Sequence, residues 1–264
     1  MSDRDRSTAD LTQPLDADAT VYPGDPAVES APAATHDSDG YRVTELRFGS
    51  HSGTHVDAPS HTEPDGKNLD AFGVEEFVFD AQLVDCTGLG ARDPIGPEVI
   101  PGPKSGGDAE TEMLVLRTGW DAHWGTDRYF DHPYLTAEAA ATCADRGWHV
   151  GLDALSPDPS PSETGTEEGE STSESVGTGK LTGAEESGEM GASAGTEKPN
   201  ETEESDGTSE PDGVPAHREL LGSGLFVVEN LTGLGEVPDR FELLAYPLAL
   251  VDADGSPVRA VATW

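Results

Sequence analysis

The sequence predicts a single α/β domain that is interrupted by one long polar insertion. Three observations indicate this: apolar runs typical of strands alternate with segments of helical spacing, 264 residues can bury one substantial core, and the composition changes abruptly at residue 156. Residues 1–155 and 215–264 are therefore expected to form the domain. Residues 156–214 are expected to form an acidic disordered insertion.

Most of the expected elements are strands. Val43–Phe48 alternates apolar and polar side chains like a half-buried strand, and Met113–Leu116 is an apolar run typical of a central strand. Thr136 is a suitable N-cap for a helix. The remaining expected elements are strands at 81–86, 150–154 and 225–230, a hairpin joining 243–251 to 257–263, and helices at 69–78, 136–146 and 217–221.

The insertion is defined by what it lacks. It contains no aromatic residue, very few aliphatic residues, and 16 acidic against 2 basic residues, a net charge of -14. Such a segment cannot bury enough apolar surface to offset the entropy of ordering it. A solvated spacer is the default interpretation, and a regulatory or partner-binding segment is the alternative.

The charge of the whole chain restricts its partners and its environment. The formal net charge is -37, of which -23 lies outside the insertion, and this repels nucleic acid and anionic membranes. So strong an acidic excess is typical of a halophile, in which high salt screens self-repulsion. The sequence contains no apolar run of 18 residues and no apolar segment at its start, which indicates a cytoplasmic protein. Cys86 and Cys143 are expected to be buried free thiols.

The segment that carries chemistry runs from His51 to His61. His51, His55, Asp57 and His61 all occupy odd positions, so an extended chain would direct their side chains to one face. A straight strand would hold His51 and His55 about 13 Å apart, so the chain must bend, and Gly53 permits the bend. The alternative, a helical pair of histidines as in metalloproteases, is disfavoured because Ser52 replaces the glutamate that such a helix requires.

This set of side chains suits a transition metal. Imidazole and carboxylate favour Zn, Mn or Fe(II) over Ca or Mg, and two histidines with one aspartate leave coordination positions open for water. A polar loop whose histidines only form hydrogen bonds is the plainer alternative.

The pattern His51-x-Gly53-Thr54-His55-x-Asp57-x-Pro59-x-His61 resembles the motif of the cyclase family of metal-dependent hydrolases, which includes bacterial kynurenine formamidases and isatin hydrolases. The resemblance continues outside the motif, over most of the chain apart from the insertion. The matching segments are 21–26, 116–118, 150–158, His217 with Glu229, and 246–259. The resemblance implies a cyclase-type (swivelling β/β/α) fold, with a mixed sheet curled around a metal site and helices outside.

The resemblance also implies roles for individual residues. Those matching His51, His55 and Asp57 bind one divalent ion, Asp57 and Glu229 bridge to a second, and His217 completes the second site. The residue matching His61 donates and accepts protons. Two ions are therefore expected, zinc or, as the alternative, manganese. Tyr22 stands where the family often carries a pocket-lining tryptophan, and a packed turn residue is its alternative role. A salt-bridged structural side chain is the alternative for Glu229.

The implied reaction is hydrolysis of a C–N bond in a small-molecule substrate, with N-formylkynurenine giving kynurenine and formate in tryptophan catabolism. A lactam or lactone ring-opening hydrolase like the isatin hydrolases is the closest alternative. A non-catalytic metal-binding protein and a metal-dependent lyase are the others, but a binding protein does not need the proton carrier His61. Relatives of this kind are commonly homodimers or larger assemblies, and we expect the same here.

Overall fold

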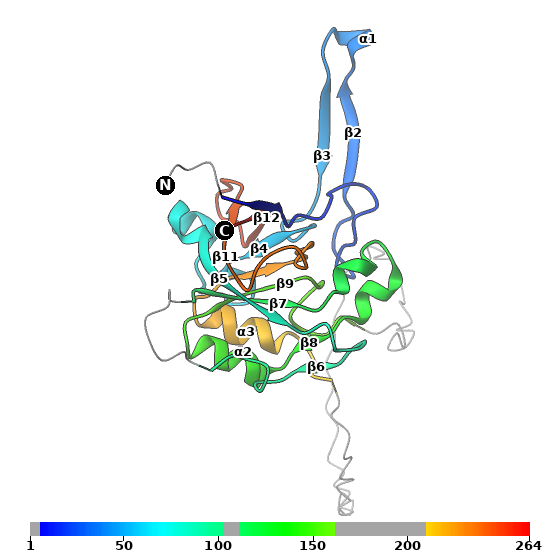
Figure 1. Ribbon diagram of the computed structural model, residues 1–264. Helices are drawn as coiled ribbons and strands as arrows, with labels where there is room; N and C mark the ends of the chain where they lie inside the picture. Colours follow the sequence, from blue (N-terminus) through cyan, green and yellow to red (C-terminus); the bar gives the residue numbers. More distant parts are fainter. Residues whose placement is uncertain (1–5, 103–110, 162–209) are drawn as a thin grey trace, which may run out of the picture. The chain divides into compact units, whose positions relative to one another are not determined.

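The main element of the fold is a mixed sheet that closes on itself. The computed structural model describes residues 6–102, 111–161 and 210–264. Eight strands follow the order β1-β12-β11-β5-β7-β9-β10-β4, and β4 also pairs with β12, so the sheet curls into a closed arrangement (Figure 1). The strands are β1 (Thr8–Asp10), β4 (His55–Asp57), β5 (Val78–Asp85), β7 (Met113–Arg117), β9 (His149–Leu152), β10 (Val227–Glu229), β11 (Arg240–Pro247) and β12 (Gly255–Thr263).

The central strand β7 of this sheet is buried on both faces. β7 pairs in parallel with β5 and β9, and β9 pairs in parallel with β10, whereas β11, β12 and β4 pair antiparallel with their neighbours. Along β7, Met113 and Val115 belong to one hydrophobic cluster, and Leu114 and Leu116 belong to the other. The continuous apolar run that predicted a central strand is thus explained, because a parallel sheet needs cover on both sides.

Two α-helices cover one face of the sheet, and their buried residues join the second cluster (Figure 1). They are α2 (Ala137–Ala144) and α3 (Pro215–Gly222). Thr136 caps α2 as predicted, because its side chain accepts a hydrogen bond from the Ala139 N–H. The helix predicted at 69–78 is wrong, since two short 3₁₀ turns occupy that range. The 3₁₀ helices are Pro59–His61, Leu69–Ala71, Val74–Phe77, Trp120–His123 and Asp127–Asp131.

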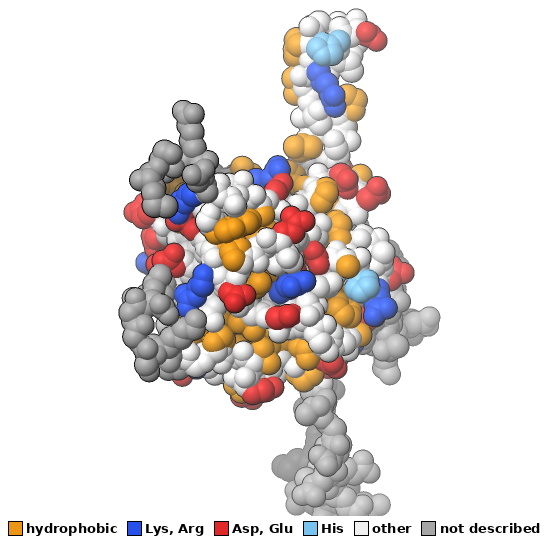
Figure 2. Space-filling view, viewed as in Figure 1, with side chains coloured by type: hydrophobic (Ala, Val, Ile, Leu, Met, Phe, Trp, Pro, Cys, Tyr) orange, Lys and Arg blue, Asp and Glu red, His pale blue; other side chains and the backbone are white. Residues whose placement is uncertain are grey.

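A two-stranded arm projects from the curled sheet (Figure 1). It consists of β2 (Glu29–Ala34), the short helix α1 (His36–Asp39) and β3 (Val43–Arg47), and β2 and β3 pair only with each other. The strand predicted from 43 therefore exists but is not half-buried: all five residues of β3 are exposed. Figure 2 shows hydrophobic side chains along this hairpin, and the large exposed ones are Tyr41, Val43 and Leu46. A second small pair joins β6 (Pro94–Ile95) to β8 (Tyr134–Leu135).

The remaining predictions concern the cysteines, the insertion and the membrane. Cys86 and Cys143 are buried free thiols, as predicted. Within the predicted insertion, residues 162–209 lie outside the described residues, but Ser156, Asp158 and Ser160 are buried against the domain. None of the described helices is long and apolar enough to cross a bilayer.

Candidate metal and catalytic site

Strand pairing places His55 opposite Glu229 at the heart of the candidate site. β4 pairs antiparallel with β10, and in this register His55 faces Glu229 and Asp57 faces Val227. Directly opposed residues in such a pair hold their side chains about 5 Å apart. His55 Nε2 lies 3.2 Å from Glu229 Oε2 and 3.2 Å from Asp57 Oδ1. Residues far apart in the chain are thus brought together by a backbone register.

A turn before β4 brings His51 back to the same point. Gly53 has φ of 65°, the left-handed conformation that glycine adopts without strain, so the predicted bend at this residue is confirmed. His51 Nδ1 then lies 2.7 Å from Asp57 Oδ1. On the other side, β12 passes so close that a Cβ on Gly255 would lie 2.5 Å from Cε1 of His51. Only glycine fits there without displacing the imidazole.

His61 reaches the site from a 3₁₀ turn, not from a strand. Only His55–Asp57 is extended, so the predicted alternation over the whole motif is wrong, although its side chains do converge. The His61 ring packs against His51 with 3.9 Å between ring centroids and lies 5.6 Å from the His217 ring. Its side chain is 31% exposed, whereas that of His55 is 2% exposed. His61 is therefore the histidine of this group with the freest access to solvent.

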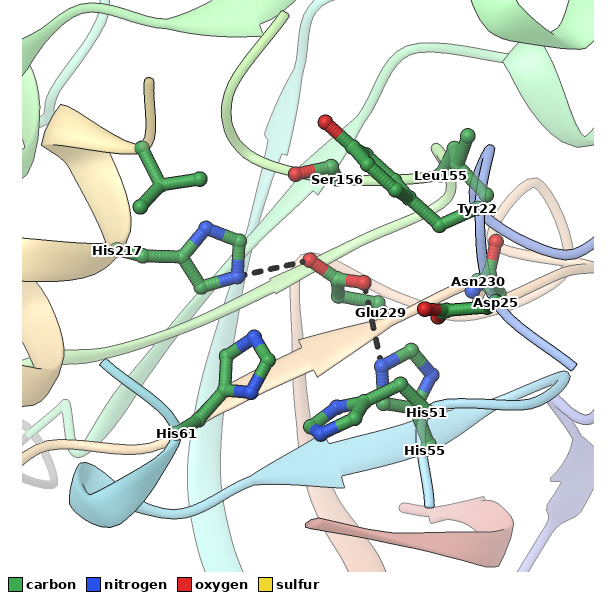
Figure 3. Close-up of a pocket in the computed structure, with 11 residues that line it drawn as sticks. Tyr22, Asp25, His51, His55, His61, Leu155, Ser156, His217, Glu229 and Asn230 are labelled. Atoms are coloured by element: carbon green, nitrogen blue, oxygen red, sulfur yellow. Dashed lines mark ion pairs between the residues drawn. The ribbon is translucent and has the colours of Figure 1, made fainter. Parts of the chain in front are cut away.

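Helix α3 supplies the other side of the site. His217 Nε2 lies 3.2 Å from Glu229 Oε1 and 3.5 Å from Asp57 Oδ2. Glu229 thus contacts both His55 and His217 through its two oxygens, as the dashed lines in Figure 3 show. The carboxylates of Glu229 and Asp57 both lie between the early and the late histidines.

The protonation states reflect crowding of opposite charges. Burial opposes a charge on His51, but the Asp57 carboxylate and the contacts with Asp254 and Asp57 outweigh it and raise its pKa to about 9. The pKa values of His55 and His217 are likewise raised well above their usual range, despite burial, by their carboxylate partners. Burial alone would raise the pKa of Asp57, but His55 and His51 hold it well below its usual range. The protonated imidazoles thus balance the negative charge of the carboxylates, and a bound cation would balance the same charge.

Unpaired buried atoms indicate what this cluster is built to hold. His55 Nε2, Asp57 Oδ2 and Glu229 Oε1 are buried and have no hydrogen-bond partner of suitable geometry, although charged groups lie nearby. Leaving such atoms unpaired is costly unless a ligand satisfies them. Three sets of side chains can each bring one ligand atom per residue within 4.8 Å of the others: His51 with His55 and Asp57, Asp57 with His217 and Glu229, and the more exposed His51 with His61 and Asp254. The first two sets contain the unpaired buried atoms and fit a metal, and Asp57 is common to both.

A cavity of about 260 Å³ opens beside these residues. Tyr22, Leu155 and Val214 form part of its wall, so Tyr22 does lie at the pocket, as predicted. Figure 3 shows Tyr22 and Leu155 on the side of Glu229 opposite His61. Burial and the nearby Glu229 carboxylate raise the pKa of Tyr22, which keeps its hydroxyl protonated.

Three supporting residues were not identified from the sequence. Asp158 accepts hydrogen bonds from the Ala216 N–H, from the His217 N–H and from His217 Nδ1, at 2.7, 3.0 and 2.7 Å. Asn230 has φ of 58°, and its side-chain amide donates to the Gly53 carbonyl at 3.0 Å, which fixes the bend of the motif. Asp254 contacts His51 and His61 from the turn before β12. Composition offered only weak signals, since each lies in a stretch typical of turns or loop starts.

Comparisons with known proteins show what the chain is similar to. Residues 9–159 match the family model Cyclase, described as "Putative cyclase". The chain is 28% identical over 255 residues to the kynurenine formamidase of Bacillus mycoides (strain KBAB4), covering 96% of this chain and 95% of the relative. A kynurenine formamidase of Bacillus cereus (strain ATCC 14579) is also 28% identical, over 256 residues. Among solved structures, isatin hydrolase A from Labrenzia aggregata has a TM-score of 0.69 at 21% identity, covering 98% of this chain and 93% of that one.

Proposed function

Because the chain belongs to the cyclase family, we propose that it is a metal-dependent hydrolase that cleaves the C–N bond of an aryl formamide, with N-formylkynurenine giving kynurenine and formate as the leading reaction. The observation that carries the proposal is the meeting of Glu229 and His217 with the early histidines around unpaired buried atoms. The near full-length similarity to kynurenine formamidases supports the choice of substrate.

We assign two divalent ions, with zinc preferred to manganese, to the residues that fit them. His51, His55 and Asp57 would hold one ion, and Asp57, Glu229 and His217 the other. When bound, two such ions supply hydroxide at neutral pH and polarise the carbonyl of the substrate. The carboxylate of Asp57 is the group shared between the two sets.

His61 is the proton carrier in this proposal. Its ring lines the cavity, and its Nδ1 lies toward Asp254, so Nε2 is the atom that faces the substrate. An aniline nitrogen leaves readily only when it receives a proton, because the anilide anion is a poor leaving group. His61 Nε2 would first take up a proton from solvent and would then donate it to the nitrogen as the C–N bond breaks, and general acid catalysis of this kind contributes about 10²- to 10⁴-fold to a rate.

The wall of the cavity suits an aromatic substrate. Tyr22, Leu155 and Val214 offer an apolar surface on which a benzene ring can pack, while Asp25 and Ser156 offer polar contacts. We propose that Tyr22 contacts the aromatic ring of the substrate.

Ring opening of an isatin-like lactam is the second candidate. It is favoured by the fold, since an isatin hydrolase bound to thioisatinate has a TM-score of 0.70 with this chain. That chain is only 21% identical, so the likeness concerns the fold.

We further propose that the protein assembles as a homodimer or larger homo-oligomer.

A direct assay tests the proposal. Purified protein in high salt should release formate from N-formylkynurenine, and isatin should be turned over more slowly. Preincubation with a chelator should stop both reactions, and added zinc should restore them. Absence of formate release from the zinc-loaded protein would refute the formamidase assignment, and faster turnover of isatin would favour the second candidate.

A further inference from the structure

The turn between β11 and β12 places a carboxylate beside the proton carrier. Asp254 Oδ2 lies 3.5 Å from His61 Nδ1 and 3.0 Å from His51 Nε2. Among the residues that the structure describes, no other carboxylate lies within 4.0 Å of a ring nitrogen of His61. The two imidazoles pack against each other at 3.9 Å, and one carboxylate oxygen serves both.

The backbone around Asp254 is held in place by the motif itself. The Ala58 N–H donates to the Asp254 carbonyl at 2.8 Å, and Gly255 pairs with Asp57 in the register of β12 with β4. The Leu69 N–H donates to the carbonyl of Ala253, so the turn is anchored on both sides of the 3₁₀ helix that ends at His61. Asp254 therefore keeps a fixed position relative to His61, although its side chain is 44% exposed.

We propose that Asp254 is a positioning residue for His61: its carboxylate accepts the Nδ1–H of the imidazole and so directs Nε2 toward the leaving nitrogen in the cavity. The inference rests on the proposed function, because it assigns His61 the role of proton carrier, whose Nε2 takes up a proton from solvent before donating it to the leaving nitrogen. A neutral imidazole in water prefers the proton on Nε2, and an acceptor beside Nδ1 reverses this preference. The contact is long for a hydrogen bond, and contacts of this kind often shorten when substrate fills the site.

The test compares substrates that differ in their need for an acid. N-Formylaniline must have its nitrogen protonated to release aniline, whereas 4-nitrophenyl formate releases 4-nitrophenolate without a proton. In zinc-loaded protein, Asp254→Asn should lower kcat for the formamide about 10- to 100-fold and leave kcat for the ester, corrected for spontaneous hydrolysis, within about twofold. Asp252→Asn is the matched control, because Asp252 is an exposed aspartate in the same turn, and it should change neither rate.

The zinc content of Asp254→Asn shows whether the carboxylate of Asp254 supports His51 or His61. If the carboxylate served His51 alone, Asp254→Asn would reduce bound zinc and lower both rates together, which would overturn the inference. An unchanged formamide rate would overturn it as well. Retention of zinc with a selective loss on the formamide would support it, since a general structural defect cannot distinguish the two leaving groups.

A spectroscopic measurement decides the matter without turnover. Nitrogen-15 correlation spectra of the histidine rings in the zinc-loaded protein should show His61 with its proton on Nδ1, and Asp254→Asn should move that proton to Nε2. Asp252→Asn should leave the spectrum of His61 unchanged. A wild-type His61 with its proton on Nε2 would overturn the inference. If the wild type hydrolyses neither substrate, the proposed function fails, and this spectrum still decides whether Asp254 positions His61.

Discussion

His217 and His61 lie next to each other in the candidate site, with 5.6 Å between their ring centroids, and they are held in opposite ways. His217 is buried, and the carboxylate of Asp158 binds both its Nδ1 and its backbone N–H. His61 is 31% exposed, and among the described carboxylates its ring nitrogens contact only Asp254, at a long 3.5 Å, a residue that is itself 44% exposed. A metal ligand gains from a fixed ring and a fixed tautomer, whereas a proton carrier must exchange its proton with substrate and solvent. The difference in support therefore matches a difference in proposed role.

The largest expected effect concerns the buried residues around His217. Removal of divalent ions with a chelator should abolish formate release and should also lower Tm, because ions bound at His217 and its partners stabilise only the folded state. Ions present at a thousandfold excess over Kd contribute about 4 kcal/mol, which for a chain of this size corresponds to about 10 °C. Scanning calorimetry with and without added zinc measures the shift. An unchanged Tm after complete ion removal would contradict the assignment of these buried residues as ligands.

The next effect concerns His61 alone. His61→Ala should lower kcat on N-formylkynurenine about 10²- to 10⁴-fold and leave the zinc content unchanged, because His61 lies outside both proposed ligand sets. His36→Ala removes an exposed histidine of α1 and provides the control. Loss of zinc from His61→Ala, or turnover equal to that of the wild type, would remove the distinction between ligand and proton carrier.

A half-buried histidine outside the site, His149, sharpens the comparison, because none of the described carboxylates pairs with it. Burial lowers the pKa of His149 to about 4, and its Nδ1 accepts a hydrogen bond from the Phe226 N–H at 2.7 Å. The unfolded chain binds this proton near pH 6.5 and the folded chain only near pH 4. The contribution of His149 to the free energy of unfolding is therefore fully present above pH 6.5 and is lost as the pH falls from 6.5 to 4. At about 1.4 kcal/mol per pKa unit, this loss amounts to about 3 kcal/mol.

His149→Gln tests this pH dependence. The variant should lose that part of the pH dependence in urea unfolding measured between pH 7 and pH 4, whereas His36→Gln should keep it. An unaltered slope in His149→Gln would show that His149 is protonated in the folded protein as readily as in the unfolded chain.

Much of the fold and of the site could be predicted from local sequence. The two-faced burial of β7 follows from an unbroken apolar run, and the helix capped by Thr136 follows from its side chain. The cyclase family and its metal-dependent amide hydrolase chemistry were recognised from the motif between His51 and His61, and the family match and the formamidase relatives confirm them. Zinc, the pairing of two ions, the homo-oligomer and the halophilic origin stay predictions.

Other features could not be predicted because they depend on contacts between distant parts of the chain. The prediction that β3 is half-buried was wrong, because an alternating pattern does not reveal whether anything packs against the strand. The domain was expected to stop at residue 155, yet the carboxylate of Asp158 is bound to a helix that begins at Pro215. The contacts of Asp254 with His51 and His61 likewise arise from the pairing of β12 with β4. Supporting residues of this kind become visible only when strand register is known.

The smallest expected effect tests how much the rigid support of His217 matters. Asp158→Asn replaces a carboxylate that accepts three N–H groups by an amide that can accept fewer, so His217 loses part of its orientation. Substitutions of this type weaken metal binding about 10- to 100-fold, and we expect this loss for one of the two ions, with kcat nearly restored at saturating zinc. Competition with a chromogenic chelator measures the affinity, and Glu219→Gln, an exposed acid on the same helix, is the control. If Asp158→Asn and Asp254→Asn weakened zinc binding equally, the two sides of the site would not differ in the way that their burial indicates.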